Sequence, residues 1–135
     1  GAAAVLDAFE ARREIIEVPG ALEIAAAIRL AERRYDAFVA LGCVIRGETT
    51  HYETVCEESA RGLTLLGVER GLSIGNGVLT CENREQAEAR ADPNRMDKGG
   101  GAALAALHLA ALSRRFAEPP SARGETLFAA DTGAA

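Results

Sequence analysis

The chain has 135 residues, of which 48% are apolar, and this suits one domain with a real hydrophobic core. Its formal charge of -5 and pI near 5.1 exclude a broad basic surface, so nucleic acids and anionic membranes are poor partners. No apolar run approaches the ~20 residues that span a bilayer, and no basic and apolar leader opens the chain, so we expect a soluble cytoplasmic protein.

The first elements are predicted from runs with different apolar spacing. Residues 1–11 read as the second half of a helix with no strand before it, so we expect the working protein to have a further N-terminal segment. Residues 14–18, Glu-Ile-Ile-Glu-Val, are predicted to form a strand that Pro-Gly at 19–20 closes. Residues 21–34 carry apolar side chains at helical spacing and predict the helix that follows.

A second strand and helix come next. Residues 37–45 are nearly all apolar, which predicts a buried strand. Residues 50–68 predict the following helix, with Thr49 or Thr50 as its N-cap.

The third strand and the next helix are predicted from residues 72–81 and 84–91. The strand contains Gly-Asn-Gly at 75–77, and these residues are expected to interrupt it. Asp-Pro-Asn at 92–94 breaks the helix, because proline cannot continue it.

The last helix is alanine-rich and leucine-rich and is predicted to end near Phe116. Lys-Gly-Gly-Gly at 98–101 leads into it and lacks the residue order of a phosphate-binding P-loop, so a flexible helix entry is expected. Residues 118–135 contain two adjacent prolines and are predicted to form a loosely ordered tail. Docking of this tail on a neighbouring subunit through Phe128 is the alternative.

The order of these elements predicts the fold class. Continuous apolar strands joined by helices indicate a parallel sheet covered on both faces, which is a three-layer α/β/α sandwich. We expect residues 1–117 to form this domain and residues 118–135 to form the tail. The small side chains of residues 102–112 suit packing against neighbouring subunits, but they equally suit an intramolecular core.

A candidate site follows the second strand. Gly-Glu-Thr-Thr at 47–50 forms a turn before a helix, where free backbone N–H groups, hydroxyls and a helix N-terminus are suited to hold an anion. His51 adds a side chain that moves protons near neutral pH. On spacing alone, a surface or capping histidine is the favoured interpretation of His51, and His108 is interpreted as a packing or surface residue.

Three cysteines are present: Cys43, Cys56 and Cys81. Their odd number and the lack of a C-x-x-C spacing disfavour a disulfide framework and a zinc site. We expect small buried apolar residues, with a reactive thiol as the alternative.

Four motifs in order resemble the lumazine synthase family. They read Val-Pro-Gly-Ala-Leu-Glu-Ile at 18–24, Ala-Leu-Gly-Cys-Val-Ile-Arg-Gly-Glu-Thr-Thr-His at 40–51, Gly-Val-Leu-Thr at 77–80 and Lys-Gly-Gly at 98–100. The resemblance implies a flavodoxin-like sheet, a homopentamer or a multiple of it, and active sites between adjacent subunits. It also implies a reaction of riboflavin biosynthesis that needs no cofactor or metal. In that reaction 5-amino-6-(D-ribitylamino)uracil condenses with 3,4-dihydroxy-2-butanone 4-phosphate.

The resemblance assigns roles to particular residues. Gly47, Glu48, Thr49 and Thr50 would bind the phosphate, and His51 would transfer protons during imine formation and phosphate loss. Arg90 of the neighbouring subunit would complete the phosphate site, because a guanidinium pairs with two phosphate oxygens at once. The remaining expected substrate contacts are Ala21, Leu22, Glu23, Val44, Ile45, Asn76 and Lys98.

Each assignment has a simpler alternative. Arg90 could be a solvated helix arginine, and Glu23 a first-turn carboxylate that favours the helix dipole. Arg46 could form a structural ion pair or contact the ligand. The chain also departs from the family pattern. The family's first strand, which ends in a stacking aromatic residue, is absent from this sequence. Asn76 stands where many members have a second aromatic residue, and Leu22 where many have phenylalanine.

Two other functions are weighed against the enzyme. One is a non-catalytic paralogue of the same fold that binds flavins or serves in assembly. The other is a generic flavodoxin-like binder of nucleotides or flavin mononucleotide, which is disfavoured because the anion turn follows an internal strand rather than the first one. The presence of His51, Arg90 and Glu23 favours the enzyme.

Overall fold

A computed structural model describes residues 1–117 and residue 130 of the chain. Its elements, in chain order, are α1 (Ala2–Ala8), α2 (Ala21–Ala31), β1 (Phe38–Ile45), α3 (His51–Arg70), β2 (Ile74–Cys81), α4 (Arg84–Ala91) and α5 (Lys98–Ala117). Apart from residue 130, the tail predicted at 118–135, with Phe128 as its docking residue, lies outside the described residues. No described helix is both long enough and apolar enough to cross a membrane.

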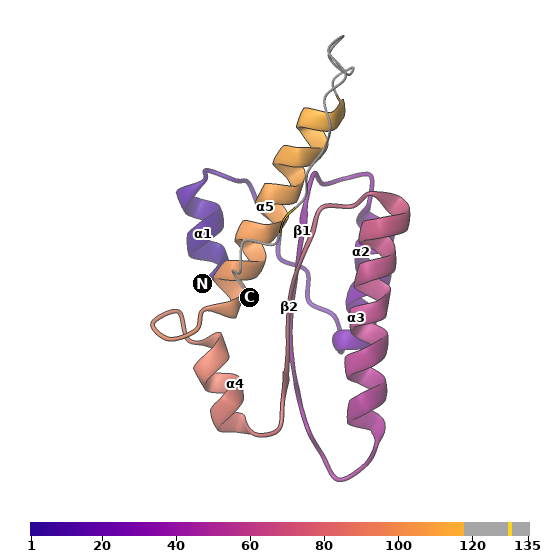
Figure 1. The fold of residues 1–135 in the computed structure, drawn as a ribbon, viewed down its shortest axis with the longest axis vertical. Coiled ribbons are helices and arrows are strands. Elements are labelled where there is room, and N and C mark those ends of the chain that lie inside the picture. Colours follow the sequence, from indigo (N-terminus) through magenta and orange to yellow (C-terminus); the bar gives the residue numbers. More distant parts are fainter. Residues whose placement is uncertain (118–129, 131–135) are drawn as a thin grey trace.

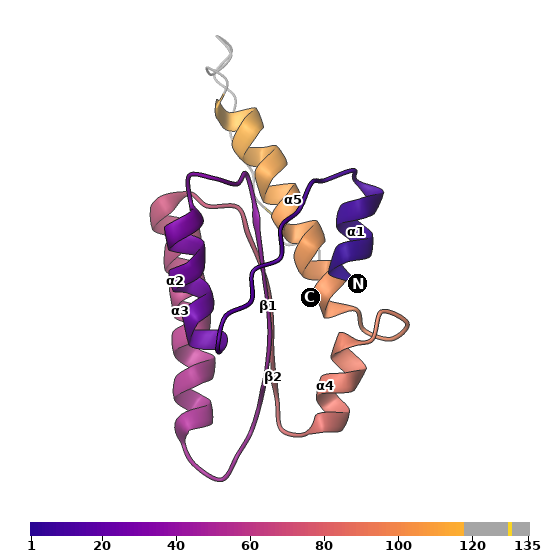
Figure 2. The same ribbon diagram turned by 180° about the vertical axis from the view of Figure 1, so that it is seen from behind.

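The described strands form one parallel pair with helices on both faces (Figures 1 and 2). β1 and β2 pair in register from Phe38 with Ile74 to Ile45 with Cys81. α2 and α3 cover one face, while α1, α4 and α5 lie on the other. Parallel neighbours need a crossover connection, which α3 supplies. The predicted three-layer α/β/α architecture is therefore confirmed, with two strands in the described sheet.

The main hydrophobic core lies between β1 and the layer formed by α2 and α3. Ile24 and Ile28 of α2, Ala40 of β1 and Leu63 of α3 are at most 9% exposed. Ile24 and Ile28 are four residues apart, so they share one face of their helix. Full burial of such an aliphatic side chain contributes about 1.5–3 kcal/mol. This packing holds α3 against the strand that leads to it.

Both strands end at the same edge of the sheet because they are parallel. At this edge β1 runs into residues 46–50 and α3, and β2 runs into α4. The two helices therefore begin close to one edge but cover opposite faces (Figure 1). In open parallel sheets, ligands bind outside the carboxyl ends of the strands. The turn that the sequence indicated as an anion site lies in this position.

The prediction that glycines interrupt the third strand is wrong. β2 begins at Ile74, two residues later than predicted, and continues through Gly75 and Gly77. A Cβ atom on Gly75 would lie 1.8 Å from the carbonyl oxygen of Ala102, and one on Gly77 would lie 3.0 Å from the Cβ of Ala102. The glycines therefore serve the close approach of α5 to β2 rather than a break in the strand.

We expect Gly75→Ala to lower the free energy of unfolding by about 3 kcal/mol or more, because a backbone carbonyl cannot rotate away from the added methyl group. Urea unfolding monitored by circular dichroism measures this change. Gly101→Ala is the matched control, since no neighbouring atom lies within 4 Å of a Cβ there and alanine favours the helix by up to ~1 kcal/mol. Equal stability changes in the two variants would contradict the close contact.

The predicted strand at 14–18 is not formed. These residues have no regular secondary structure, and no backbone hydrogen bond joins residues 12–19 to another described residue. A strand is stable only where a neighbouring strand completes its hydrogen-bond ladder. Among the described residues β1 pairs only with β2, so the apolar alternation of 14–18 finds no ladder.

Several helix ends differ from the predicted ones. α2 ends at Ala31, three residues early. Thr50 occupies the N-cap position of α3 without a side-chain cap bond, and the hydroxyl of Thr49 instead accepts from the backbone N–H of His51 at 3.4 Å. α5 begins before its glycines, so the predicted flexible entry at 98–101 is helical; the carboxylate of Asp97 accepts from the backbone N–H of Gly100 at 3.0 Å.

An ion pair connects the end of α2 with the end of α3. Arg70 donates to Glu32 at 2.8 Å, and the Glu32 side chain is only 10% exposed. The Arg70 hydrogen bond lowers the pKa of Glu32 below its ordinary value of 4.5, and the charges of Arg29, Arg70 and Arg33 act in the same direction. A carboxyl group whose pKa is lowered by folding stabilises the folded state at pH values above its ordinary pKa. This stabilisation is lost as the pH falls through the pKa of the folded state.

Glu32→Gln is therefore expected to reduce the midpoint temperature at pH 7, and the difference from the parent should shrink to near zero as the pH falls below 4.5. Thermal unfolding followed across this pH range tests the expectation. Glu69→Gln is the control, because no ion pair to Glu69 occurs within residues 1–117. A constant difference at every pH would show that the carboxylate charge is not the cause.

Candidate active site

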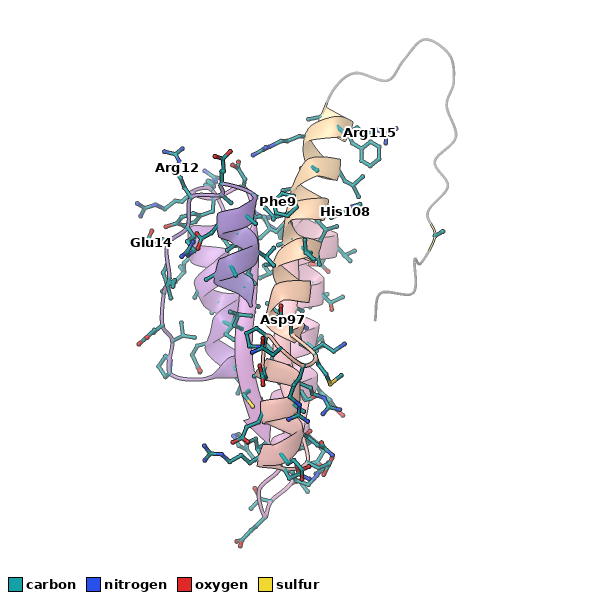
Figure 3. All side chains as sticks on the ribbon, turned by 90° about the vertical axis from the view of Figure 1, so that its left-hand side faces the viewer. Phe9, Arg12, Glu14, Asp97, His108 and Arg115 are labelled. Atoms are coloured by element: carbon teal, nitrogen blue, oxygen red, sulfur yellow. The ribbon has the colours of Figure 1, made fainter. Side chains whose placement is uncertain are left out.

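A cavity of about 1770 Å³ lies beside β1, on the edge that does not pair with β2. Residues 9–18, α2, β1 and part of α5 line it. Figure 3 shows three of its lining residues, Phe9, Arg12 and Glu14, around the end of α1. Small-ligand sites usually occupy about 300–1,000 Å³, so a substrate would fill only part of this space.

Five of the expected site residues meet at this cavity. They are Ala21, Leu22, Glu23, Val44 and His51. The first three form the first turn of α2, Val44 lies near the end of β1, and His51 begins α3. These groups lie up to 30 positions apart in the sequence. The packing of α2 and α3 against β1 brings them to one wall of the cavity.

The turn at 47–50 supplies free hydrogen-bond donors beside this wall. All four residues are exposed, and their backbone N–H groups donate to no other residue in the described part of the chain. The first turn of the 20-residue helix α3 follows directly, with its own N–H groups and the positive end of its dipole. This arrangement can hold an anion such as a phosphate group.

The side chain of His51 is exposed and makes no hydrogen bond among residues 1–117. The hydroxyl of Thr49 accepts a hydrogen bond from the backbone N–H of His51. Because no residue among 1–117 is bonded to the imidazole, the imidazole remains available for a ligand. Glu23 is in the first turn of α2, and its carboxylate oxygen lies 3.0 Å from the position of a Cβ on Gly20. The carboxylate therefore folds back over the Pro-Gly turn at the cavity wall.

Ile45 ends β1 directly after Val44, whereas three other expected site residues lie elsewhere in the single chain. Asn76 lines a separate groove between α3, β2 and α5, and its side-chain oxygen accepts from the backbone N–H of Val78 at 3.0 Å. Arg90 lies in the last turn of α4 and donates to the carbonyl of Gln86 at 3.0 Å. Lys98 is the first residue of α5 and is half-buried.

α4 and α5 lie on the face of the sheet opposite α2 and α3 (Figure 1). Arg90 and Lys98 are therefore separated from His51 by the sheet within one chain. The structure brings together the residues expected for one half of the site and leaves this second group apart from them. His108 also lies on α5 and is exposed (Figure 3), which agrees with the surface interpretation of this residue.

Arg46 forms ion pairs, one of the two interpretations that the sequence left open. It contacts Glu82 after β2 and Glu53 in the first turn of α3. The Arg46 hydrogen bond lowers the pKa of Glu53, and a backbone hydrogen bond adds to this effect. The sequence did not indicate Glu82 as a partner, because no local pattern joins residues 36 positions apart.

The cysteines differ in exposure. Cys81 is buried as expected, Cys56 is half-buried and Cys43 is exposed, so the expectation of buried residues is wrong for Cys43. Partial desolvation, followed by the nearby Cys81, raises the pKa of the Cys43 thiol, which disfavours a reactive thiolate. Within residues 1–117 and 130, no group of three or more His, Cys, Asp or Glu side chains could hold a metal ion.

Comparisons with known proteins give a consistent result. A sequence model of the family described as 6,7-dimethyl-8-ribityllumazine synthase matches residues 1–114. A relative of that name from Jannaschia sp. (strain CCS1) is 56% identical over 122 residues, which cover 89% of this chain and 68% of the relative. Another, from Sphingopyxis alaskensis, is 58% identical over 118 residues, 86% of this chain and 83% of the relative. A third, from Bartonella henselae, is 52% identical over 122 residues, which cover 87% of this chain and 79% of the relative.

Proposed function

The chain belongs to the 6,7-dimethyl-8-ribityllumazine synthase family, and we propose that it is the transferase of riboflavin biosynthesis that forms this lumazine. Its substrates are 5-amino-6-(D-ribitylamino)uracil and 3,4-dihydroxy-2-butanone 4-phosphate, and phosphate and water are released. The family match over residues 1–114 carries this conclusion. No observation on the described residues favours the non-catalytic paralogue.

The turn at 47–50 binds the phosphate of the four-carbon substrate. Its free N–H groups and the N-terminus of α3 support this role, since they supply hydrogen bonds and a positive dipole end. The hydroxyls of Thr49 and Thr50 offer further donors. The chain's overall charge of -5 agrees with an anion site that is local rather than part of a broad basic surface.

His51 transfers protons between the bound substrates. The amino group of the uracil attacks the ketone and water leaves to form an imine, after which phosphate is lost and the ribitylamino nitrogen closes the second ring with loss of a second water. Each step moves a proton to or from nitrogen, carbon or oxygen, and a histidine beside the phosphate turn is placed for this. Much of the acceleration comes from holding two substrates together on one wall.

The first turn of α2 and the end of β1 hold the ribityl-uracil. Ala21, Leu22, Glu23 and Val44 line the cavity next to His51, which supports this assignment. The Glu23 carboxylate accepts hydrogen bonds from ribityl hydroxyls, and Val44 with Ile45 lies along the pyrimidine. Asn76, which lines a separate groove within one chain, stands where the family has a second stacking aromatic, so stacking contributes less to binding of the ring.

Arg90 and Lys98 act from a neighbouring subunit in a homopentamer or a multiple of it. Their position on the face of the sheet opposite His51 supports a site shared between subunits. Arg90 has one hydrogen bond to its own helix and no carboxylate partner in residues 1–117, so most of its five N–H donors remain for a phosphate. We place the enzyme in the cytoplasm.

The test is to mix both substrates with the assembled full-length protein and to follow lumazine absorbance. Product formation at a rate above the uncatalysed condensation is expected. No product from properly assembled protein would contradict the enzyme. Calorimetry with flavin mononucleotide, compared with the ribityl-uracil, would then detect a flavin-binding paralogue.

A further inference from the structure

Arg46 connects three elements at the edge of the sheet where the phosphate turn begins. Its backbone N–H donates to the carbonyl of Cys81 at 2.9 Å, which extends the pairing of β1 with β2. Its guanidinium donates to Glu82 at 2.6 Å through Nε and at 3.3 Å through Nη2. Nη1 donates to Glu53 of α3, and the guanidinium carbon lies 4.2 Å from the centre of the Tyr52 ring.

These contacts enclose the turn from both ends. Residues 47–51 lie between Arg46 on one side and Tyr52 and Glu53 on the other, so the Arg46 side chain closes a short loop. The pairing with Glu82 fixes this closed loop to β2. A loop held at both ends has fewer conformations, so its backbone N–H groups point in fewer directions.

The charge balance opposes direct binding of phosphate by Arg46. Two carboxylates face one guanidinium, so the cluster of Arg46, Glu53 and Glu82 has a net negative charge. The hydrogen bonds of Glu82 and then Glu53 raise the pKa of Arg46, which stays charged and paired. The second carboxylate oxygen of Glu53 is shielded from solvent and has no hydrogen-bond partner among the described residues, so Glu53 depends on Arg46.

We propose that Arg46 is a positioning residue: with Glu53, Glu82 and Tyr52 it sets the orientation of the turn at 47–50 and of His51 toward the phosphate without contacting the substrate. This inference rests on the proposed function, because it assigns the phosphate to that turn. It predicts that the carboxylates of Glu53 and Glu82, though negative, increase the affinity for a negatively charged substrate.

The decisive variants keep Arg46 and change its partners. Glu82→Gln and Glu53→Gln should each raise KM for the four-carbon phosphate roughly tenfold, with a smaller change in kcat and in KM for the ribityl-uracil. If Arg46 instead binds the phosphate, each substitution frees its guanidinium from one carboxylate. KM for the four-carbon phosphate would then stay unchanged or fall. An unchanged or lowered KM would overturn the proposal, and so would a loss of kcat alone.

Two further measurements separate positioning from folding. Arg46→Lys keeps the charge but cannot pair with both carboxylates, so it should raise the same KM, whereas an unchanged KM would count against the proposal. Glu58→Gln is the matched control: Glu58 pairs with Arg61 on the outside of α3 and does not touch the turn, so its KM values should remain those of the parent. Variants are compared only where circular dichroism and assembly match the parent.

The proposed function and this inference fail in different ways. If the parent protein forms no lumazine, the enzyme assignment fails. Binding of inorganic phosphate, followed by the broadening of its phosphorus resonance, then still reports on the turn. Weaker phosphate binding by Glu82→Gln and Glu53→Gln would support the positioning role, and equal or stronger binding would overturn it.

Discussion

Replacement of His51 with glutamine is expected to lower kcat by roughly 10²–10⁴-fold, which is the usual contribution of a general acid or base. The imidazole is exposed at the start of α3 and has no hydrogen-bond partner within residues 1–117, so the free energy of unfolding should stay close to that of the parent. KM for either substrate should change little, because the phosphate is held by the turn before His51. Lumazine absorbance at saturating substrates measures the change in kcat.

The activity that remains is as informative as the activity that is lost. Holding both substrates on one wall still accelerates their condensation, so the His51→Gln variant should exceed the uncatalysed rate. His108→Gln provides the matched control, because this exposed histidine of α5 does not line the cavity and lies outside the turn at 47–51. Complete inactivity of a folded, assembled His51 variant would contradict this division of roles, as would full activity.

The sequence was informative where one local property decides the structure. The continuous apolar run at 37–45 predicted β1, and Asp-Pro-Asn at 92–94 predicted the end of α4. It was misleading where a distant neighbour decides. Residues 14–18 have a strand pattern but no ladder partner in the described chain, and Gly75 is a strand residue because the backbone of α5 lies against it.

The same distinction applies to the site. The resemblance of four motifs to the family predicted the group at Ala21, Glu23, Val44 and His51, and the cavity gathers these residues. The role of Arg46 could not be read in this way. Its partner Glu82 is determined by the register that sets Ile45 beside Cys81, and this register is a property of the folded sheet. Residue identity alone left both an ion pair and a ligand contact open.

Replacement of Arg90 with lysine is expected to raise KM for the four-carbon phosphate about 10- to 100-fold, because lysine keeps the charge but loses the planar fork that pairs with two phosphate oxygens. KM for the ribityl-uracil should change much less. Arg84→Lys is the control on the same helix: its side chain is exposed and pairs with Glu88 at 2.8 Å. Equal effects of the two substitutions would indicate a general disturbance of α4 rather than a phosphate contact of Arg90.

A mixed assembly tests whether Arg90 acts on a neighbouring subunit. In a ring with head-to-tail interfaces, each site takes His51 from one chain and Arg90 from the next. Coexpressed His51→Gln and Arg90→Lys chains should then form intact sites at about a quarter of the interfaces, and at concentrations of the four-carbon phosphate well below the parent's KM their activity should exceed that of either variant alone. If both residues served the same site within one chain, mixing would restore nothing. Since the sheet separates α4 from α3 in one chain, recovery of activity is the expected outcome.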